Sequence, residues 1–450
     1  MQPQPLPGFR DFYPAEFALR AYIFDHWRRT CARYGFEEFD GPPLEPLELY
    51  TAKSGDEIVG QLYNFIDKGG REVALRPELT PTVARMVAAR AGGMKKPIRW
   101  FSIGQMFRYE RQQRGRLREF FQLNCDLMGE PGPLADAELI ALAVDLMRAF
   151  GLGPGEVRVR LSDRRVLQAL LRGAGVTEAQ LPVAYGVIDK LERMKPEQLA
   201  ELQDGRDTRF GPGVGPRLLA VAALRGWPAV RAALESTEGG AAAGAPLGEV
   251  LEALRAMGIA EFVDVDLTIV RGLAYYTGTV FELFDAGRSL RAIAGGGRYD
   301  GLLNLLGGVD LPAVGFAIGD VVLGELLQER NLAPAPAAAV DVFAAGVTAE
   351  DLPHVLRLAH ELRDQGLRVE FALRAEGLGK QLKLADARQA AFAVVIGPDD
   401  RARGEVQLKD LAGKGQEAVA EIELARVLHA RLAARPPDRP TAGPSDRPTA

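Results

Sequence analysis

FRYERQQRGRLREFFQ, residues 107–122, concentrates positive charge in one short stretch of the chain. Its five arginines are Arg108, Arg111, Arg114, Arg116 and Arg118. The whole chain of 450 residues is nevertheless acidic, with a formal net charge of −5. Such a cluster of fixed charge either covers a solvated surface or holds a polyanion. The negative net charge argues against bulk binding of nucleic acid, but it does not exclude a local basic site.

The arginine stretch joins two segments that have the character of β-strands. Residues 98–110 (IRWFSIGQMFRYE) and 118–129 (REFFQLNCDLMG) are both rich in apolar and aromatic residues, and the second alternates apolar with polar side chains. The loop between them is polar and contains Gln, Arg and Gly. This pattern predicts a β-hairpin. The arginines are therefore expected on the hairpin and in its loop, and not on a helix face.

Helices and further strands are predicted on either side of this hairpin. Pro14 begins a helix in which large apolar residues recur every four positions until Gly35, and residues 136–153 also have helical periodicity. Residues from about 165 to 260 are rich in Leu, Ala and Arg at helical spacing, which predicts a helical insertion. Strand signals return over residues 262–285 and continue further along the chain.

An Ala- and Pro-rich stretch, residues 331–340, predicts a domain boundary near position 334. Beyond it the pattern runs strand, helix, strand, helix, strand, which is typical of a small α/β domain with a parallel sheet. We therefore expect one domain over residues 1–333 and a second over residues 335–434. The last residues, 435–450, are rich in proline and repeat DRPTA, so we expect them to be disordered.

Composition disfavours several kinds of site. Cys31 and Cys125 are the only cysteines, so neither a disulfide framework nor a thiolate zinc site is expected. The four histidines do not pair at the spacing of metal ligands, and the GxxxxGK[ST] pattern of a P-loop is absent. There is no run of 18 apolar residues and no N-terminal signal pattern, which predicts a cytoplasmic protein without a membrane span.

Two short stretches contain residue types suited to ligand binding but also have structural explanations. The glycine run of residues 294–301 (AGGGRYDG) fits a bulge or tight turn, or a backbone that a ligand approaches closely. Residues 75–80 (LRPELT) bring an arginine, a carboxylate and a hydroxyl together, which also fits a loop with a local salt bridge. Neither stretch identifies a ligand by itself.

A third stretch, residues 267–282 (LTIVRGLAYYTGTVFE), is predicted to be a strand with a buried arginine. If it alternates regularly, the residues on one face are Ile269, Arg271, Leu273 and Tyr275. A buried guanidinium needs an anionic partner. That partner is either a carboxylate of the protein or a bound anion, and the stretch alone favours neither.

These motifs together resemble one family. The stretches 75–80, 107–122, 270–282 and 294–301 occur in this order and are followed by GKQLKLAD (379–386) and VVIGPDD (394–400) in the second domain. In this combination the chain closely resembles the histidyl-tRNA synthetases, a family of class II aminoacyl-tRNA synthetases. The resemblance runs from PGFRDFYP to about residue 434 and leaves out only the tail.

The resemblance implies an α+β fold. It implies a six-stranded antiparallel catalytic sheet with flanking helices over residues 1–333, with the helical insertion at about 165–260, and an anticodon-binding α/β domain over residues 335–434. It also implies a homodimer. The implied function is activation of L-histidine with ATP to histidyl-adenylate and transfer of histidine to the 3′ end of tRNA(His), with Mg²⁺ accompanying ATP.

The resemblance also implies roles for individual residues. Those implied to bind ATP are Arg108, Glu110, Arg116 and Arg271, and Arg108 and Arg271 are also implied to be catalytic. Those implied to bind histidine are Glu78, Thr80, Gln122, Asp126, Tyr275, Tyr276, Gly295 and Gly296. No dedicated metal ligand is identified. Arginine suits this chemistry, because a carboxylate must attack a phosphate and the charge that builds up must be neutralised by preorganised cations.

Four features depart from the family pattern. Ala274 replaces an acid, Gln112 replaces a proline, and Asp126 replaces a longer glutamate. The third class II motif reads GFAIGDVVLGELL, so that Val322 stands where the family has an arginine that stacks on adenine and reaches the γ-phosphate. Arg114 or Arg116 could compensate for that missing arginine.

The departures leave a second function open. The alternative is a non-catalytic, histidine-binding regulatory paralogue similar to the regulatory subunit of ATP phosphoribosyltransferase. The presence of Arg108, of Arg271 and of the C-terminal domain, which such regulators generally lack, favours the enzyme.

Overall fold

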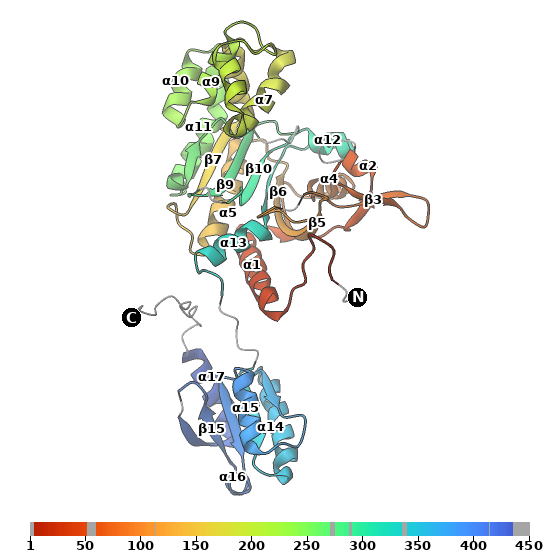
Figure 1. The fold of residues 1–450 in the computed structure, drawn as a ribbon, viewed down its shortest axis with the longest axis vertical. Coiled ribbons are helices and arrows are strands. Elements are labelled where there is room, and N and C mark those ends of the chain that lie inside the picture. Colours follow the sequence, from red (N-terminus) through yellow and green to blue (C-terminus); the bar gives the residue numbers. More distant parts are fainter. Residues whose placement is uncertain are drawn as a thin grey trace. The chain divides into compact units, whose positions relative to one another are not determined.

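The computed structural model describes residues 4–51, 60–111, 113–270, 275–287, 290–334, 340–413 and 415–434. The chain divides into two compact units between Ala333 and Pro334 (Figure 1).

The strands of the first unit are β1 Glu37–Glu38, β2 Leu44–Pro46, β3 Tyr63–Ile66, β4 Glu72–Leu75, β5 Ile98–Phe107, β6 Glu119–Met128, β7 Val157–Asp163, β8 Val263–Val265, β9 Thr279–Asp285, β10 Ala294–Arg298 and β11 Ala313–Gly319. Its α-helices are α1 Pro14–Arg33, α2 Glu48–Thr51, α4 Thr80–Ala88, α5 Pro133–Arg148, α6 Arg164–Gly173, α7 Leu181–Lys190, α8 Pro196–Gln203, α9 Val214–Ala222, α10 Trp227–Glu235, α11 Gly240–Ala256, α12 Leu302–Gly307 and α13 Asp320–Glu329.

One large sheet organises this first unit. Its strand order is β1-β5-β6-β11-β10-β9-β7-β8. The six inner strands, from β5 to β7, are antiparallel throughout, whereas the two short edge strands β1 and β8 pair in parallel with their neighbours. The six-stranded antiparallel sheet that the resemblance implied is therefore confirmed, with two edge strands added to it. A separate small sheet has the order β2-β4-β3.

The predicted hairpin is confirmed by the pairing of β5 with β6. Ten residue pairs join these strands, from Ile98 opposite Met128 to Phe107 opposite Glu119. The arginine-rich segment between the strands forms the loop of the hairpin. It contains a tight turn at Gly115, whose φ of 71° lies in the left-handed region that favours glycine.

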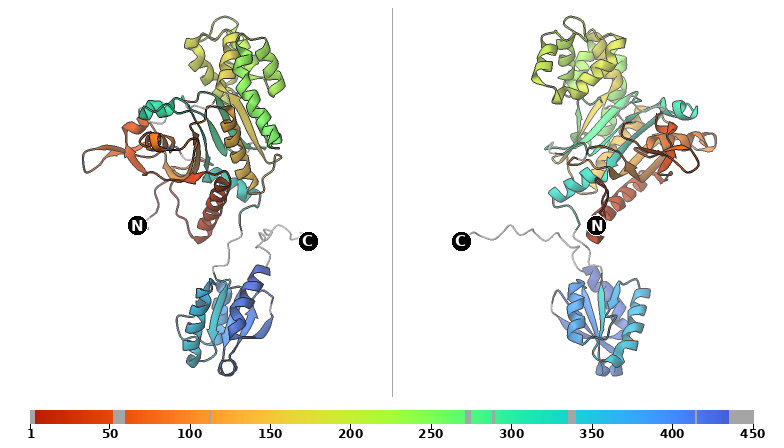
Figure 2. Two further views of the ribbon diagram at one scale, coloured as in Figure 1. Left: turned by 180° about the vertical axis from the view of Figure 1, so that it is seen from behind. Right: turned by 45° about the vertical axis from the view of Figure 1, so that its right-hand side comes forward.

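Helices cover the large sheet and extend one end of it. Most residues of α5 are buried, because this helix packs against both the sheet and α1, and α1 in turn packs against α13. The helices α7 to α10 gather beyond one end of β7 and β9, and α11 runs back from them to pack along α5 (Figure 2). They correspond to the helical insertion expected at about 165–260. Within the described residues, no helix is long and apolar enough to cross a membrane.

The strand predicted over residues 267–282 is wrong in its first part, whereas its last residues belong to β9. Residues 267–270 are not in a strand, because the side chain of Asp266 turns the backbone. Its Oδ1 atom accepts hydrogen bonds from the backbone nitrogen and the hydroxyl of Thr268, at 3.0 and 2.7 Å. Asp and Asn side chains commonly stabilise turns in this way. Residues 271–274, including Arg271 and Ala274, lie outside the described residues.

The second unit contains a five-stranded sheet with helices. Its elements are β12 Val342–Gly346, α14 Leu352–Asp364, β13 Val369–Phe371, α15 Leu378–Ala387, β14 Phe392–Ile396, α16 Pro398–Arg403, β15 Glu405–Asp410, β16 Gln416–Ala420 and α17 Leu424–Ala434. The order is β13-β12-β14-β15-β16. The first three strands are parallel, as the alternation of strands and helices predicted, but β15 and β16 add an antiparallel hairpin that the pattern did not predict. The tail, residues 435–450, lies outside the described residues.

Candidate active site

One face of the large sheet brings distant sequence motifs into two cross-strand rows. Across β6, β11, β10, β9 and β7, the first row is Asn124, Ala317, Gly295, Glu282 and Arg160. The second row is Asp126, Gly315, Gly297, Val280 and Ser162. Residues opposite one another in a ladder share a face of the sheet. The face therefore has small residues in its middle and polar or charged side chains toward its sides, which makes a trough.

The floor of this trough has no room for side chains. A Cβ atom at Gly297 would lie 2.7 Å from the carbonyl oxygen of Thr279 and 2.9 Å from the ring of Tyr276. A Cβ atom at Gly315 would lie 2.9 Å from the carbonyl oxygen of Cys125 and would overlap the carboxylate of Asp126. Glycine at these positions therefore lets Tyr276 and Asp126 lie directly over the backbone.

Aromatic and acidic residues implied to bind histidine form a connected cluster at the Asp126 side of the trough. The hydroxyl of Tyr299 donates a hydrogen bond to Oδ1 of Asp126. The ring of Tyr275 packs edge-to-face on Tyr299 at 5.9 Å, and its hydroxyl lies 3.5 Å from Oε2 of Glu78. The ring of Tyr276 lies 5.2 Å from that of Tyr275. The structure thus brings together residues from four separate motifs.

Tyr299 is held in its protonated form. Both Tyr299 and Asp126 are 3% exposed. Burial first, and then the charge of Asp126 and their hydrogen bond, raise the pKa of Tyr299 well above its ordinary value. The phenol is therefore a fixed donor that orients the Asp126 carboxylate. Tyr299 belongs to the AGGGRYDG motif but was not singled out from the sequence, because nothing in the sequence indicates that it reaches Asp126.

Three other residues implied to bind histidine have different surroundings. Thr80 is the first residue of α4 and is half-buried, two positions after Glu78. Gln122 lies on the same strand face as Asp126. Gly296 faces the other side of the sheet, where a Cβ atom would lie 2.5 Å from Cβ of Phe316. The structure therefore gives Gly296 a packing constraint, whereas Gly295 faces the trough.

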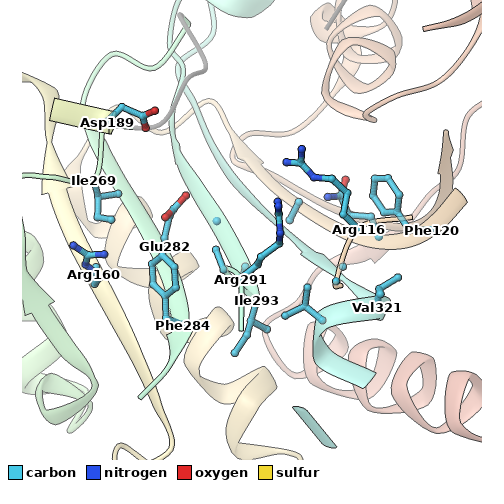
Figure 3. Close-up of a pocket in the computed structure, with 18 of the residues that line it drawn as sticks. Arg116, Phe120, Arg160, Asp189, Ile269, Glu282, Phe284, Arg291, Ile293 and Val321 are labelled. Carbon is cyan, nitrogen blue, oxygen red and sulfur yellow. The ribbon is translucent and has the colours of Figure 1, made fainter. Parts of the chain in front are cut away.

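A cavity of about 620 Å³ adjoins the trough (Figure 3). The residues implied by sequence that line it are Arg108, Glu110, Arg116, Gln122 and Gly295. Further lining residues that the sequence did not single out include Phe120, Arg160, Asp189, Glu282 and Arg291. The hairpin, the glycine strand and the start of α13 thus enclose one space, into which both cations and carboxylates project.

The hairpin arginines in this cavity have defined partners. The Nε atom of Arg108 donates to the carbonyl oxygen of Pro77 at 2.9 Å, which ties the hairpin to the segment that holds Glu78. The guanidinium of Arg108 also lies over the ring of Phe120, at 5.4 Å from its centroid. Arg116 forms an ion pair with the buried Glu110, with 2.5 Å between Nε and Oε2.

Next to the hairpin loop, the wall of the cavity is apolar where α13 begins. Val321 and Val322 line this wall. Arg114, one of the two arginines expected to compensate for Val322, is occupied elsewhere. It pairs with Glu329 and lies 3.4 Å from Glu325, and both acids are on α13. Arg114 does not line the cavity.

Among the described residues, no group of three or more His, Cys, Asp and Glu side chains could hold a metal ion. A metal in this cavity would depend on ligands from a bound substrate. Mg²⁺ commonly binds in this way, through substrate phosphates together with one or two carboxylates. Glu282 places one carboxylate on the trough face beside Gly295, so the cavity fits a cation that arrives with phosphates.

Comparison with known protein families gives two matches along the chain. The family model described as Histidyl-tRNA synthetase matches residues 8–320, and the one described as Anticodon binding domain matches residues 339–431. A histidine–tRNA ligase from Opitutus terrae is 47% identical over 425 residues, which cover 92% of this chain and 95% of that protein. A histidine–tRNA ligase from Haloarcula marismortui is 39% identical over 422 residues, which cover 92% of this chain and 94% of that protein.

Solved structures give similar matches. A crystal structure of histidyl-tRNA synthetase from Nostoc sp. PCC 7120 matches with a TM-score of 0.81 at 28% sequence identity, covering 96% of this chain and 99% of that chain. A Bacillus halodurans structure described as an ATP phosphoribosyltransferase regulatory subunit/histidyl-tRNA synthetase matches with a TM-score of 0.72 at 25% identity, covering 88% of this chain and 98% of that chain.

Proposed function

The chain belongs to the histidyl-tRNA synthetase family, and from this premise we propose how its residues divide the reaction. Its function is that of a histidine–tRNA ligase, which activates L-histidine with ATP and transfers the histidine to tRNA(His). The observation that carries this function is 47% identity to a histidine–tRNA ligase over 92% of the chain. The match of residues 339–431 to an anticodon-binding model favours the ligase over a regulatory subunit.

The trough binds the histidine side chain in this proposal. The carboxylate of Asp126 accepts a hydrogen bond from the imidazole, and Tyr276 contacts the ring. The support is that Asp126 is buried and oriented by Tyr299, while Tyr276 lies over Gly297. An amino acid without ring nitrogens would leave the buried Asp126 without that partner, and such sites reject analogues by about 10⁴-fold or more.

The amino group and the carboxylate of histidine lie nearer the hairpin. Glu78, Thr80 and Gln122 bind the amino group, and the backbone of the strand at Gly295 approaches the bound amino acid. Arg108 binds the histidine carboxylate and the α-phosphate of ATP together. Its hydrogen bond to Pro77, next to Glu78, supports this arrangement, because it holds the cation beside the amino-group ligands.

ATP occupies the cavity next to the trough in this proposal. Glu110 and Arg116 hold the adenine and the phosphates, and Phe120 offers a ring face to the base. The histidine carboxylate then attacks the α-phosphorus, and pyrophosphate leaves. The protein contributes position and charge, because the nucleophile and the phosphate are both anionic. Arg271 is proposed to stabilise the same transition state from the resemblance alone, since it lies outside the described residues.

Mg²⁺ is proposed to enter with ATP. When bound it would neutralise phosphate charge, and Glu282, which lines the cavity beside Gly295, is a carboxylate that would hold it. We further propose that residues 1–333 form the catalytic domain and that residues 335–434 bind the anticodon region of tRNA(His). A homodimer and a cytoplasmic location are proposed from the family.

Aminoacylation tests the whole function. Purified protein, ATP, Mg²⁺, radiolabelled histidine and a tRNA(His) transcript should give acid-precipitable histidyl-tRNA. A transcript with a different anticodon and acceptor end is the matched control and should not be charged. Charging of neither transcript, by protein that activates histidine, would contradict the transfer step.

A further inference from the structure

The cavity wall that should face the ATP phosphates lacks a cation at its expected position. Val321 and Val322 line this wall at the start of α13, and Val322 is 8% exposed. Valine side chains cannot neutralise a polyphosphate. Bringing several phosphate charges against an apolar surface is costly unless another cation reaches the same space. A cation that takes the place of the arginine absent at position 322 is therefore to be sought among the described residues around this wall.

Arg291 reaches this wall from another part of the chain. It precedes β10 by three residues and lines the cavity, and its side chain extends into the middle of the space (Figure 3). The turn at Gly115 lies close to both Val322 and Arg291. A Cβ atom there would be 3.3 Å from Cγ2 of Val322 and 3.7 Å from Cδ of Arg291. Arg291 and Val322 therefore flank the same turn of the hairpin loop.

Among the described residues, no acidic side chain forms an ion pair with Arg291. Its Nη2 atom donates to Oε1 of Gln113, which is an uncharged amide, and no described carboxylate lies within ion-pair distance. Burial first, and then the neighbouring cations Arg116 and Arg193, lower its pKa, and Glu110 opposes this only in part. Arg116 and Arg114, by contrast, both pair with acids.

A guanidinium that lines a substrate cavity and has no acidic side chain as its partner is suited to bind an anion. Arginine forks two donors onto phosphate oxygens, and its neutral partner Gln113 can be exchanged for them at little cost. The histidine carboxylate is a smaller anion, and in the proposed site Arg108 already binds it. The cavity volume of about 620 Å³ leaves space for a nucleoside triphosphate.

We propose that Arg291 binds the β- and γ-phosphates of ATP and does so in place of the arginine absent at position 322. This inference rests on the proposed function. As the histidine carboxylate oxygen bonds to the α-phosphorus, the bond from that phosphorus to the bridging oxygen breaks, and its electron pair leaves with pyrophosphate. Arg291 stabilises the charge on that leaving group. No oxidant, reductant or further reactant is required.

Kinetics of two substitutions test this role. In histidine-dependent ATP–pyrophosphate exchange, Arg291→Ala should raise KM for ATP and for pyrophosphate by about 10- to 100-fold. KM for histidine should change by less than about 3-fold, because that substrate lies in the trough. Arg291→Lys keeps the charge but loses the fork, so it should recover part of the loss. Equal changes in KM for ATP and histidine would overturn the proposal.

Arg114→Ala is the matched control, because Arg114 belongs to the same loop but is 63% exposed and paired with α13. Its KM for ATP should stay close to that of the unmodified protein. An increase as large as that of Arg291→Ala would mean that general disturbance of the loop causes the effect, and would overturn the proposal. Thermal melting of both variants checks that they are folded.

A binding measurement separates this inference from the proposed function. Titration calorimetry of magnesium pyrophosphate into the full chain requires no turnover. Pyrophosphate binding that Arg291→Ala weakens by about 10-fold or more supports the inference even if the chain failed to activate histidine. Undiminished binding in Arg291→Ala overturns the inference even if the unmodified chain is fully active.

Discussion

The buried phenol of Tyr299 donates a hydrogen bond to the carboxylate of Asp126, although the two residues lie 173 positions apart. One follows the glycine strand β10 and the other is on the hairpin strand β6. Glycine at 315 makes this contact possible, because a Cβ atom there would lie 3.0 Å from the Tyr299 hydroxyl and overlap the carboxylate. The pair fixes the direction in which Asp126 faces the trough.

Removal of this hydrogen bond should weaken histidine binding. Tyr299→Phe leaves the ring in place and takes away the donor, so the Asp126 carboxylate loses its orientation. We expect KM for histidine in ATP–pyrophosphate exchange to rise about 10-fold, with KM for ATP nearly unchanged. Tyr34→Phe is the control, because it removes a comparable bond, 2.8 Å from the Tyr34 hydroxyl to Asp145, outside the trough. The same change in KM for histidine in both variants would contradict the role given to Tyr299.

Arg108 should contribute mainly to the chemical step. Arg108→Ala removes the cation that the proposal places between the histidine carboxylate and the α-phosphate. We expect kcat of the exchange reaction to fall by about 10²- to 10³-fold. Arg111→Ala, an exposed arginine of the same stretch, serves as the control and should keep normal exchange. A kcat for Arg108→Ala near that of the control would remove Arg108 from the proposed mechanism.

The two units should separate activation from transfer. Each unit has its own hydrophobic core, with clusters that end at Leu327 in the first and begin at Val340 in the second. A chain truncated after residue 334 should therefore retain histidine-dependent exchange and lose most tRNA charging. Both activities are measured on the same preparation. Undiminished charging would mean that the second unit does not contribute to tRNA binding.

Asp266 should make stability depend on pH. Burial alone would raise the pKa of this carboxyl, but hydrogen bonds from Thr268 and the charge of Arg160 outweigh burial and lower it. An acid with a lowered pKa in the folded state stabilises the fold above its unfolded pKa of about 4, and this stability is lost as pH falls through the folded pKa. Asp266→Asn should therefore cost about 1 to 3 kcal/mol at pH 7.

Denaturant unfolding of Asp266→Asn and of the unmodified chain measures this dependence. The difference in unfolding free energy should be largest above about pH 5 and should shrink below about pH 4. The substitution should also reduce exchange activity, because Asp266 shapes the turn that leads toward residue 271. A difference that stays constant from pH 7 to pH 3 would show that the ionised carboxylate does not contribute in this way.

Local patterns in the sequence predicted much of the fold. The hairpin of β5 and β6 and the helix that begins at Pro14 follow from periodicity and turn residues, and the structure confirms them. The strand predicted through Ile269 is wrong because the carboxylate of Asp266 forms a turn that alternation does not reveal. The strands β15 and β16 were missed because their short segments are rich in polar residues, and in β16 only Val419 is buried.

The contacts within the site could be predicted from the sequence less completely than the fold could. Five of the residues implied by the family motifs line the cavity, but their partners were not predicted. Tyr299 and Arg291 contact residues more than 170 positions away, and these contacts form only when distant parts of the chain come together in the fold. The sequence indicated that a cation was missing at Val322 and suggested Arg114 or Arg116. The structure instead places Arg291 and Val322 against the same turn at Gly115.

Histidine-dependent ATP–pyrophosphate exchange with the purified full chain tests the central claim most directly. We expect exchange that requires histidine, that is not supported by other amino acids, and that occurs despite valine at position 322. Absence of exchange in protein that still binds histidine would contradict the ligase function, because the trough would then hold its ligand without activating it.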